Sequence, residues 1–158
     1  MALFILTFSL IFGSACLALR WGDSPEKSAA IVMLVMVIVS FSGNILNGYH
    51  YVRIDPVGVL SDLSGLAGFV AIALFARRIW PLWASSLQLI AFAAHLSRAL
   101  EVHIHPTAYA IMRWGPSDLI PVLLIAGTIN CLRRKRRGGS CPPWRDWSER
   151  SNQKELIG

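Results

Sequence analysis

The stretch AAIVMLVMVIVSFSGNILNGY, residues 29–49, contains no formally charged residue. An apolar helix of about 20 residues rises about 30 Å, which is enough to cross the hydrocarbon core of a bilayer. Comparable apolar runs occur elsewhere in the chain, over residues 2–19, 57–76, 79–97 and 117–132. Within these runs the only acidic residues are Asp62 and Asp118. The pattern predicts an all-α fold, a polytopic bundle of transmembrane helices.

The helix-start signals set the expected boundaries. Ser24 followed by Pro25 and Glu26 is typical of a capped helix start, because proline fits the first turn and an acid favours the positive end of the helix dipole. Asp55-Pro56 repeats the signal, and Arg77-Arg78 indicates the end of that span. We predict five spans, over residues 2–19, 25–47, 57–76, 79–100 and 117–132. Together they make one bundle domain, 1–132, followed by a basic tail, 133–158.

Two alternatives remain at the ends of this bundle. The first span could be a cleaved signal peptide, which would leave four spans, but it lacks a basic region before its apolar stretch. Residues 106–132 could form one long tilted helix, or a short surface helix over 107–114 followed by a span. Gly115-Pro116 favours the break, because proline disrupts a continuing helix.

Positive charge is sorted to one side of the predicted spans. If the tail is cytoplasmic, 12 Lys and Arg residues lie inside and only Arg53, Arg98 and Arg113 lie outside. Lys and Arg are enriched in cytoplasmic segments, so we predict an outside N-terminus and an inside C-terminus. The tail begins with five consecutive basic residues, which would anchor the last span and attract anionic lipids: Arg133, Arg134, Lys135, Arg136 and Arg137.

The bulk composition supports a membrane protein and argues against nucleic-acid binding. The chain has 158 residues, 54% hydrophobic and 15% charged, and a net charge of +6. That charge is not accompanied by aromatic stacking platforms or a nucleic-acid-binding motif, so the bilayer is the expected partner. From residue 138 the tail is rich in Gly, Ser, Pro and charge, and we expect it to be either disordered or interfacial.

Polar residues in the apolar layer gather near the outer side of the predicted bundle. Asp62 and His95 lie within spans, about 9 Å and about 7 Å from the outer ends at 1.5 Å per residue. On the third span, Ser61-x-x-x-Gly65 and Ser64-x-x-x-Gly68 permit close helix approach, which would bring Asp62 toward its partners. The full candidate cluster is Asn44, Asn47, Asp62, His95, Arg98 and Asp118.

Two interpretations of this cluster stand beside each other. In one the polar groups bond across helices and fix the register of the bundle. In the other they form a pocket for a proton, an ion, a quinone or a lipid headgroup. Metal or b-type haem would need histidine ligands, for which the candidates are His50, His95, His103 and His105. We expect no bound cofactor, since surface histidines beside interfacial aromatic residues explain this set equally well.

The chain lacks the common catalytic motifs, and no nucleophile–base pair is evident, so we expect no enzyme activity. Its three cysteines indicate no disulfide framework. Arg20-Trp21-Gly22-Asp23 with Pro25-Glu26, and Trp80-Pro81-Leu82-Trp83-Ala84 through Gln88-Leu89 and His95-Leu96, resemble small uncharacterised inner-membrane proteins of alphaproteobacteria. The resemblance covers residues 20–132. It implies a multi-pass protein of a bacterial inner membrane and no particular activity.

Three functions are compatible with these features. The first is a non-catalytic subunit or accessory protein of an inner-membrane assembly, packed against another membrane protein or a second copy of itself. The second is a membrane anchor that binds a ligand through the outer polar cluster. The third is a transporter or channel, which would have to be oligomeric because one chain with five spans offers no inverted pair of repeats.

Overall fold

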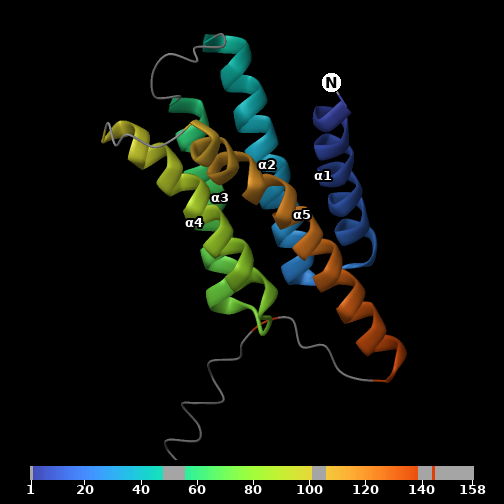
Figure 1. Cartoon of the computed structure of the whole chain (residues 1–158). Helices are drawn as coiled ribbons and strands as arrows, with labels where there is room; N and C mark the ends of the chain where they lie inside the picture. Colours follow the sequence, from blue (N-terminus) through green and yellow to red (C-terminus); the bar gives the residue numbers. More distant parts are fainter. Residues whose placement is uncertain (1, 48–55, 101–105, 139–143, 145–158) are drawn as a thin grey trace, which may run out of the picture.

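The computed structural model describes residues 2–47, 56–100, 106–138 and 144. These residues form helices and no strand, apart from an isolated bridge between Ala76 and Trp144, so the predicted all-α class is confirmed. The five helices in chain order are α1 (Ala2–Trp21), α2 (Ser24–Asn47), α3 (Pro56–Phe75), α4 (Trp80–Ala99) and α5 (Pro106–Arg136), as Figure 1 shows.

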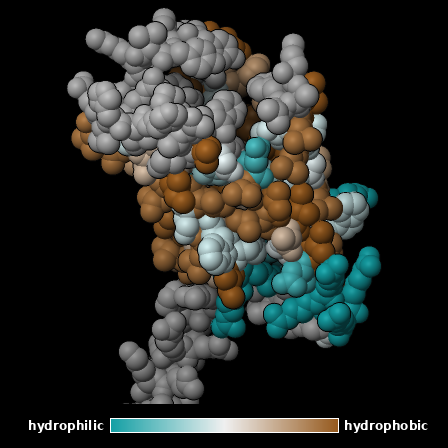
Figure 2. Space-filling view, in the orientation of Figure 1, coloured by the Kyte–Doolittle hydropathy of each residue, from teal (hydrophilic) through white to brown (hydrophobic). Residues whose placement is uncertain are grey.

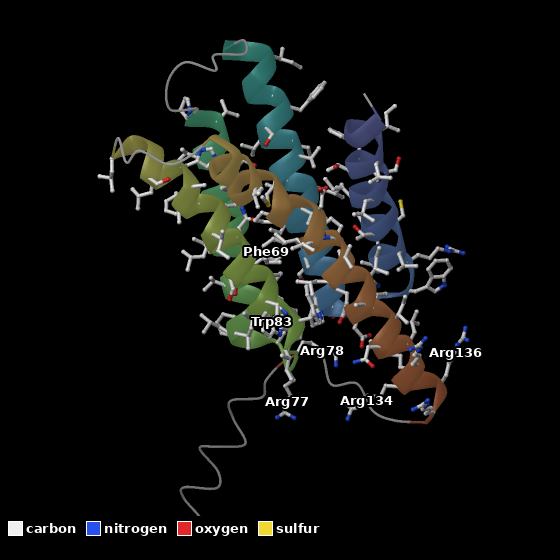
Figure 3. All side chains as sticks on the ribbon, in the orientation of Figure 1. Phe69, Arg77, Arg78, Trp83, Arg134 and Arg136 are labelled. Atoms are coloured by element: carbon white, nitrogen blue, oxygen red, sulfur yellow. The ribbon has the colours of Figure 1, made fainter. Side chains whose placement is uncertain are left out.

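Each helix packs beside the next one along the chain, and α5 also packs on α1 and α2 (Figure 1). Successive helices run in opposite directions, so the basic segments meet at one end of the bundle. We call this the basic end and define it by the following residues: Arg20, Lys27, Arg77, Arg78 and the run 133–137. It lies at the bottom of Figure 3, where Arg77, Arg78, Arg134 and Arg136 are labelled.

The first four helices begin and end within two residues of the predicted spans, but the fifth does not. α5 continues through Pro116 and Pro121, so the predicted break of the helix at Gly115-Pro116 is wrong. Proline removes only its own N–H from the hydrogen-bonded ladder. A full break in apolar surroundings would leave several backbone groups without partners, which costs more.

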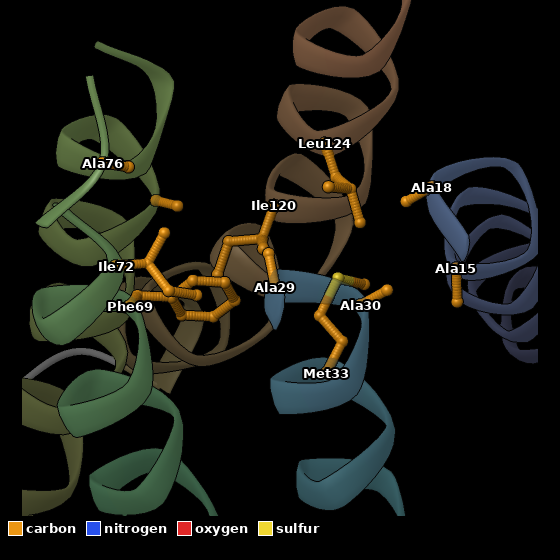
Figure 4. Packing of buried hydrophobic residues seen from close by; sticks show 11 residues of the cluster. Ala15, Ala18, Ala29, Ala30, Met33, Phe69, Ile72, Ala76, Ile120 and Leu124 are labelled. Carbon is orange, nitrogen blue, oxygen red and sulfur yellow. The ribbon is translucent and has the colours of Figure 1, made fainter. Parts of the chain in front are cut away.

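The core is built largely from small side chains. Ala15, Ala18, Ala29 and Ala30 are buried between α1 and its neighbours, and Phe69 is the largest fully buried side chain (Figure 4). Small residues let helix backbones approach closely, and close packing drives helix association in lipid.

The predicted small-residue pattern on α3 does form a close contact, and its partner is α2. Gly65 lies against Met36, and Gly68 lies against Val32. The hydroxyl of Ser61 donates to the Met36 carbonyl over 3.1 Å. This contact fixes how α3 faces α2 and therefore where the neighbouring Asp62 points.

Large apolar side chains cover the outside of the bundle. Each of the five helices exposes several of them, and Figure 2 shows a mostly hydrophobic middle with hydrophilic residues at the basic end. Among the described residues, two segments are long and apolar enough to cross a membrane, Ser24–Gly43 and Pro56–Phe75. Only 22% and 28% of these two windows are buried inside the bundle.

Candidate functional site

A carboxylate and an imidazole meet between α3 and α4. Nε2 of His95 lies 3.1 Å from Oδ2 of Asp62. His95 is 4% exposed and the Asp62 side chain is 18% exposed, so the imidazole is inside the bundle and the carboxylate is at its rim. The structure therefore brings together two members of the predicted polar cluster, and Asp62 pairs with the residue that the sequence placed at a similar depth.

Gln88 completes this group, which we call the Asp62–His95 site: Asp62, Gln88 and His95. The Gln88 amide donates to Oδ1 of Asp62 over 2.9 Å and to the Asp62 backbone carbonyl over 3.4 Å. Gln88 and His95 are seven residues apart, about two helical turns, so both lie on the buried face of α4. Each carboxylate oxygen thus has its own partner from α4.

The other predicted members of the cluster do not join this site in the described part of the chain. Asp118 accepts a hydrogen bond of 2.8 Å from Thr7 of α1 instead. The side chains of Asn44, Asn47 and Arg98 lie outside the described residues. The same holds for three of the histidines considered as metal or haem ligands, at positions 50, 103 and 105. In the described ranges, no group of three or more His, Cys, Asp or Glu residues is arranged to hold a metal ion.

Sequence reasoning missed a second polar network, at the basic end. Its centre is Asp23, in the short link between α1 and α2. Lys135 Nζ donates to Oδ1 of Asp23 over 2.6 Å, and Arg78 Nη2 donates to Oδ2 over 3.4 Å. The Cys131 thiol also donates to Oδ2, over 3.2 Å. The network forms where the α1–α2 link, the α3–α4 turn and the end of α5 converge.

Glu26 is the buried half of this network and caps α2. One of its oxygens accepts from the Asp23 backbone N–H over 3.1 Å, which is the reciprocal half of a capping box. The other lies 3.3 Å from Nε of Arg78 and accepts from the indole of Trp80 over 3.4 Å. The carbonyl of Asp23 accepts from the Lys27 N–H, so Asp23 is the capping residue in place of the expected Ser24, and α2 starts at Ser24.

The electrostatics of Asp23 follow from these contacts. Burial on its own would raise the pKa of Asp23. Hydrogen bonds from Lys135 and Cys131, together with the positive charges of Lys135 and Arg78, nevertheless hold this pKa below its ordinary value. Asp23 therefore stays ionised and ties the α1–α2 link to α5 and to the α3–α4 turn.

One sequence signal would have pointed to this network. Asp23-Ser-Pro-Glu26 has the spacing of a capping box, and Arg77-Arg78 lies in a tight turn that must end on the same side. The pairing of Asp23 with Lys135 has no local signal, because it depends on α5 extending to Arg136.

The two networks differ in what they can do chemically. The network at the basic end ties three segments together with ion pairs, and the Asp62–His95 site places a carboxyl group beside an imidazole between α3 and α4. No family model, curated protein or solved structure matches the chain, so function has to be argued from this geometry.

Proposed function

We propose that the chain is a multi-pass integral membrane protein in which all five helices span the bilayer. The observation that carries this proposal is the inverted distribution of side chains. Alanine, serine and glutamine are buried, whereas large residues such as Phe12, Ile38 and Leu74 face outward. A water-soluble bundle would bury these residues. Lipid is as apolar as leucine, so helices in a membrane associate through small and polar residues instead.

The proposed orientation places the basic end in the cytoplasm and the N-terminus outside. Basic side chains from the end of α1, the start of α2, the α3–α4 turn and the end of α5 converge there. The acids at that end, Asp23 and Glu26, are paired with cations. The exposed charge is therefore strongly positive, which suits the anionic lipids of a cytoplasmic leaflet.

Within the membrane, we assign the chain the role of a non-catalytic subunit or accessory protein of a bacterial inner-membrane assembly. Its described polar groups at depth bond to one another inside the bundle, as Asp62, Gln88 and His95 do. The outward faces are apolar along each helix. Such faces suit packing against another membrane protein or a second copy.

Two experiments test these assignments separately. Single cysteines placed in the tail after residue 138 should react with a membrane-impermeant maleimide only after the cells are opened, and labelling of intact cells would overturn the orientation. Purification in mild detergent should recover a stoichiometric membrane partner or a defined homo-oligomer. A monodisperse monomer with no partner would contradict the accessory role but leave the membrane assignment standing.

A further inference from the structure

We propose that the Asp62–His95 site binds and releases a proton within the membrane. The proposal rests on the membrane placement given above. Its basis is geometric: Oδ2 of Asp62 and Nε2 of His95 are 3.1 Å apart, and the other carboxylate oxygen is held by Gln88. An isolated charge at membrane depth is costly, and a carboxylate beside an imidazole avoids that cost while the pair holds one proton. Proton occupancy then determines the charge of the site.

The proton balance is simple. With one proton, the pair is neutral overall, either as carboxylate with imidazolium or as carboxylic acid with imidazole. Uptake of a second proton from water leaves the carboxylic acid beside the imidazolium, and its release restores the neutral pair. Only O–H and N–H bonds form or break, so no other reactant is needed. Two coupled groups of this kind titrate as a pair.

Among the described side chains, few other charged groups lie on the helices packed around this site. α3 packs on α2 and α4. On α2 the titratable residues are Glu26 and Lys27, at the opposite end of the bundle. On α4 they are His95 and Arg98, and the Arg98 side chain lies outside the described residues.

α5, which packs on α4, carries Arg113 near its start and the basic run at its far end. The Arg113 side chain also lies outside the described residues. Asp118 of α5 is bonded to Thr7. Among the described side chains, His95 is therefore the titratable group placed against the Asp62 carboxyl group.

Asp62 is positioned to exchange its proton with the surroundings. It lies six residues into α3, about 9 Å from the helix start at 1.5 Å per residue. Its side chain is 18% exposed, and the residues next to Asp62 on α3 and to Gln88 on α4, Leu63 and Leu89, are exposed apolar residues. A small lipid-soluble reagent can therefore approach the carboxyl group, while a charged reagent dissolved in water is kept out.

The test uses two carbodiimides on the full-length protein in liposomes, with peptide mass spectrometry to locate the product. A carbodiimide adds to a protonated carboxyl group, and rearrangement to the stable acylurea retains the whole reagent mass. We expect the lipid-soluble dicyclohexylcarbodiimide to label Asp62, with a rate that rises on the order of tenfold per pH unit as pH falls above the transition. A cationic, water-soluble carbodiimide should label Asp62 at least tenfold more slowly. The exposed Asp118 is the internal comparison.

A variant identifies the role of His95. His95→Gln keeps a hydrogen-bonding side chain but removes the positive charge that balances the carboxylate. We expect it to displace the labelling profile of Asp62 along the pH axis. Asp118→Asn, the matched control, should leave that profile unchanged. A merely structural role of His95 would leave the profile in place.

The outcomes separate this proposal from the proposed function. If the two reagents label Asp62 equally fast, Asp62 is not in the membrane, and both proposals fail. If neither reagent labels Asp62, or if lipid-soluble labelling does not depend on pH, the proton site is overturned while the membrane assignment stands. If His95→Gln leaves the labelling profile of Asp62 unchanged, His95 is not part of the proton site, and the proposal is also overturned. These tests include wild-type protein, so they do not depend on a variant that folds.

Discussion

Single small residues decide how closely the helices approach, and Gly68 is the clearest case. A Cβ atom at this position would lie 2.6 Å and 2.8 Å from the two terminal carbons of Val32 on α2. The branched valine has little freedom to move within a helix. α3 could therefore accept a side chain at position 68 only by moving away from α2, which would disturb the Ser61 contact with α2.

We accordingly expect Gly68→Leu to destabilise the bundle by about 1–3 kcal/mol, the usual cost of overpacking. The measurement is the unfolding midpoint in detergent, followed by far-UV circular dichroism. Gly13→Leu on α1 is the matched control, because a Cβ there would meet nothing within 4 Å. Helix propensity favours leucine over glycine at both positions, so equal losses in the two variants would show that the contact with Val32 is not responsible.

Asp23 makes stability depend on pH in a definite direction. Its pKa is lower in the folded protein than the unfolded value of about 3.9. Its contribution is therefore fully present above the unfolded value and is lost as pH falls through the lowered folded value. We expect the wild-type unfolding free energy to decline below about pH 4. Asp23→Asn should be less stable at neutral pH and decline less over the same acidic range. Parallel curves would exclude Asp23 as a source of this dependence.

At the scale of whole helices, the lengths of the apolar runs and the capping signals predicted most of the helix boundaries. α3 begins at Pro56 and α2 at Ser24, each one residue before its expected start, because proline and acidic residues set helix starts locally. α5 differs, because it continues through Pro116 and Pro121 although Gly115-Pro116 favours a break. The membrane that we propose around the bundle would favour a continuous ladder of hydrogen bonds over the local preference of proline.

In the candidate sites, too, some features could be predicted from the sequence and others could not. The depth of Asp62 and His95 could be counted along their helices, so their pairing could be anticipated. Asp118 was predicted to join the same cluster, but it accepts a hydrogen bond from Thr7 on α1 instead. The rotation of a helix about its axis depends on which helices are neighbours, and the sequence does not show that. The network around Asp23 was missed for a related reason, since three distant segments must converge to form it.

Substitutions of Glu26 test how strongly the network around Asp23 holds α2 in place. Its side chain is fully buried and bonds to the Asp23 N–H, Arg78 and Trp80. Glu26→Ala would leave Asp23 as the acidic partner of Arg78 but remove the acceptor of the Asp23 N–H and the Trp80 indole, so we expect a loss of about 1–3 kcal/mol in unfolding free energy. Glu26→Gln retains one acceptor oxygen, for either the Asp23 N–H or the Trp80 indole, and should cost less than Glu26→Ala.

The neighbouring Lys27 provides the control for this series. Its side chain is exposed on the same turn, and Lys27→Ala should change the unfolding free energy by no more than about 0.5 kcal/mol. If Glu26→Ala has an equally small effect, the network does not hold the bundle together.

For the molecule as a whole, the central matter is which solvent surrounds the bundle. Small residues such as Ala29 and Ala84 fill its interior, while bulky ones such as Leu63 and Val70 lie outside. In water this arrangement would leave a large apolar surface exposed on every helix and would favour aggregation. In lipid the same surface carries no penalty, and the small interior residues allow close packing. The two solvents therefore make opposite predictions for a charge on the outer face.

Ile38 is the position at which these predictions separate best. It is 61% exposed and lies near the middle of α2. In a membrane, Ile38→Asp would place a carboxylate among lipid chains, at a cost of about 3–4 kcal/mol relative to isoleucine. We expect the membrane-inserted fraction to fall severalfold, measured as resistance to carbonate extraction. Ile38→Leu, which keeps the bulk without the charge, should insert normally. Ile79→Asp, in the turn between α3 and α4, should also insert normally because it lies outside the spans. If Ile38→Asp inserts as well as wild type, or if the variant becomes a stable soluble monomer, the bundle is not solvated by lipid.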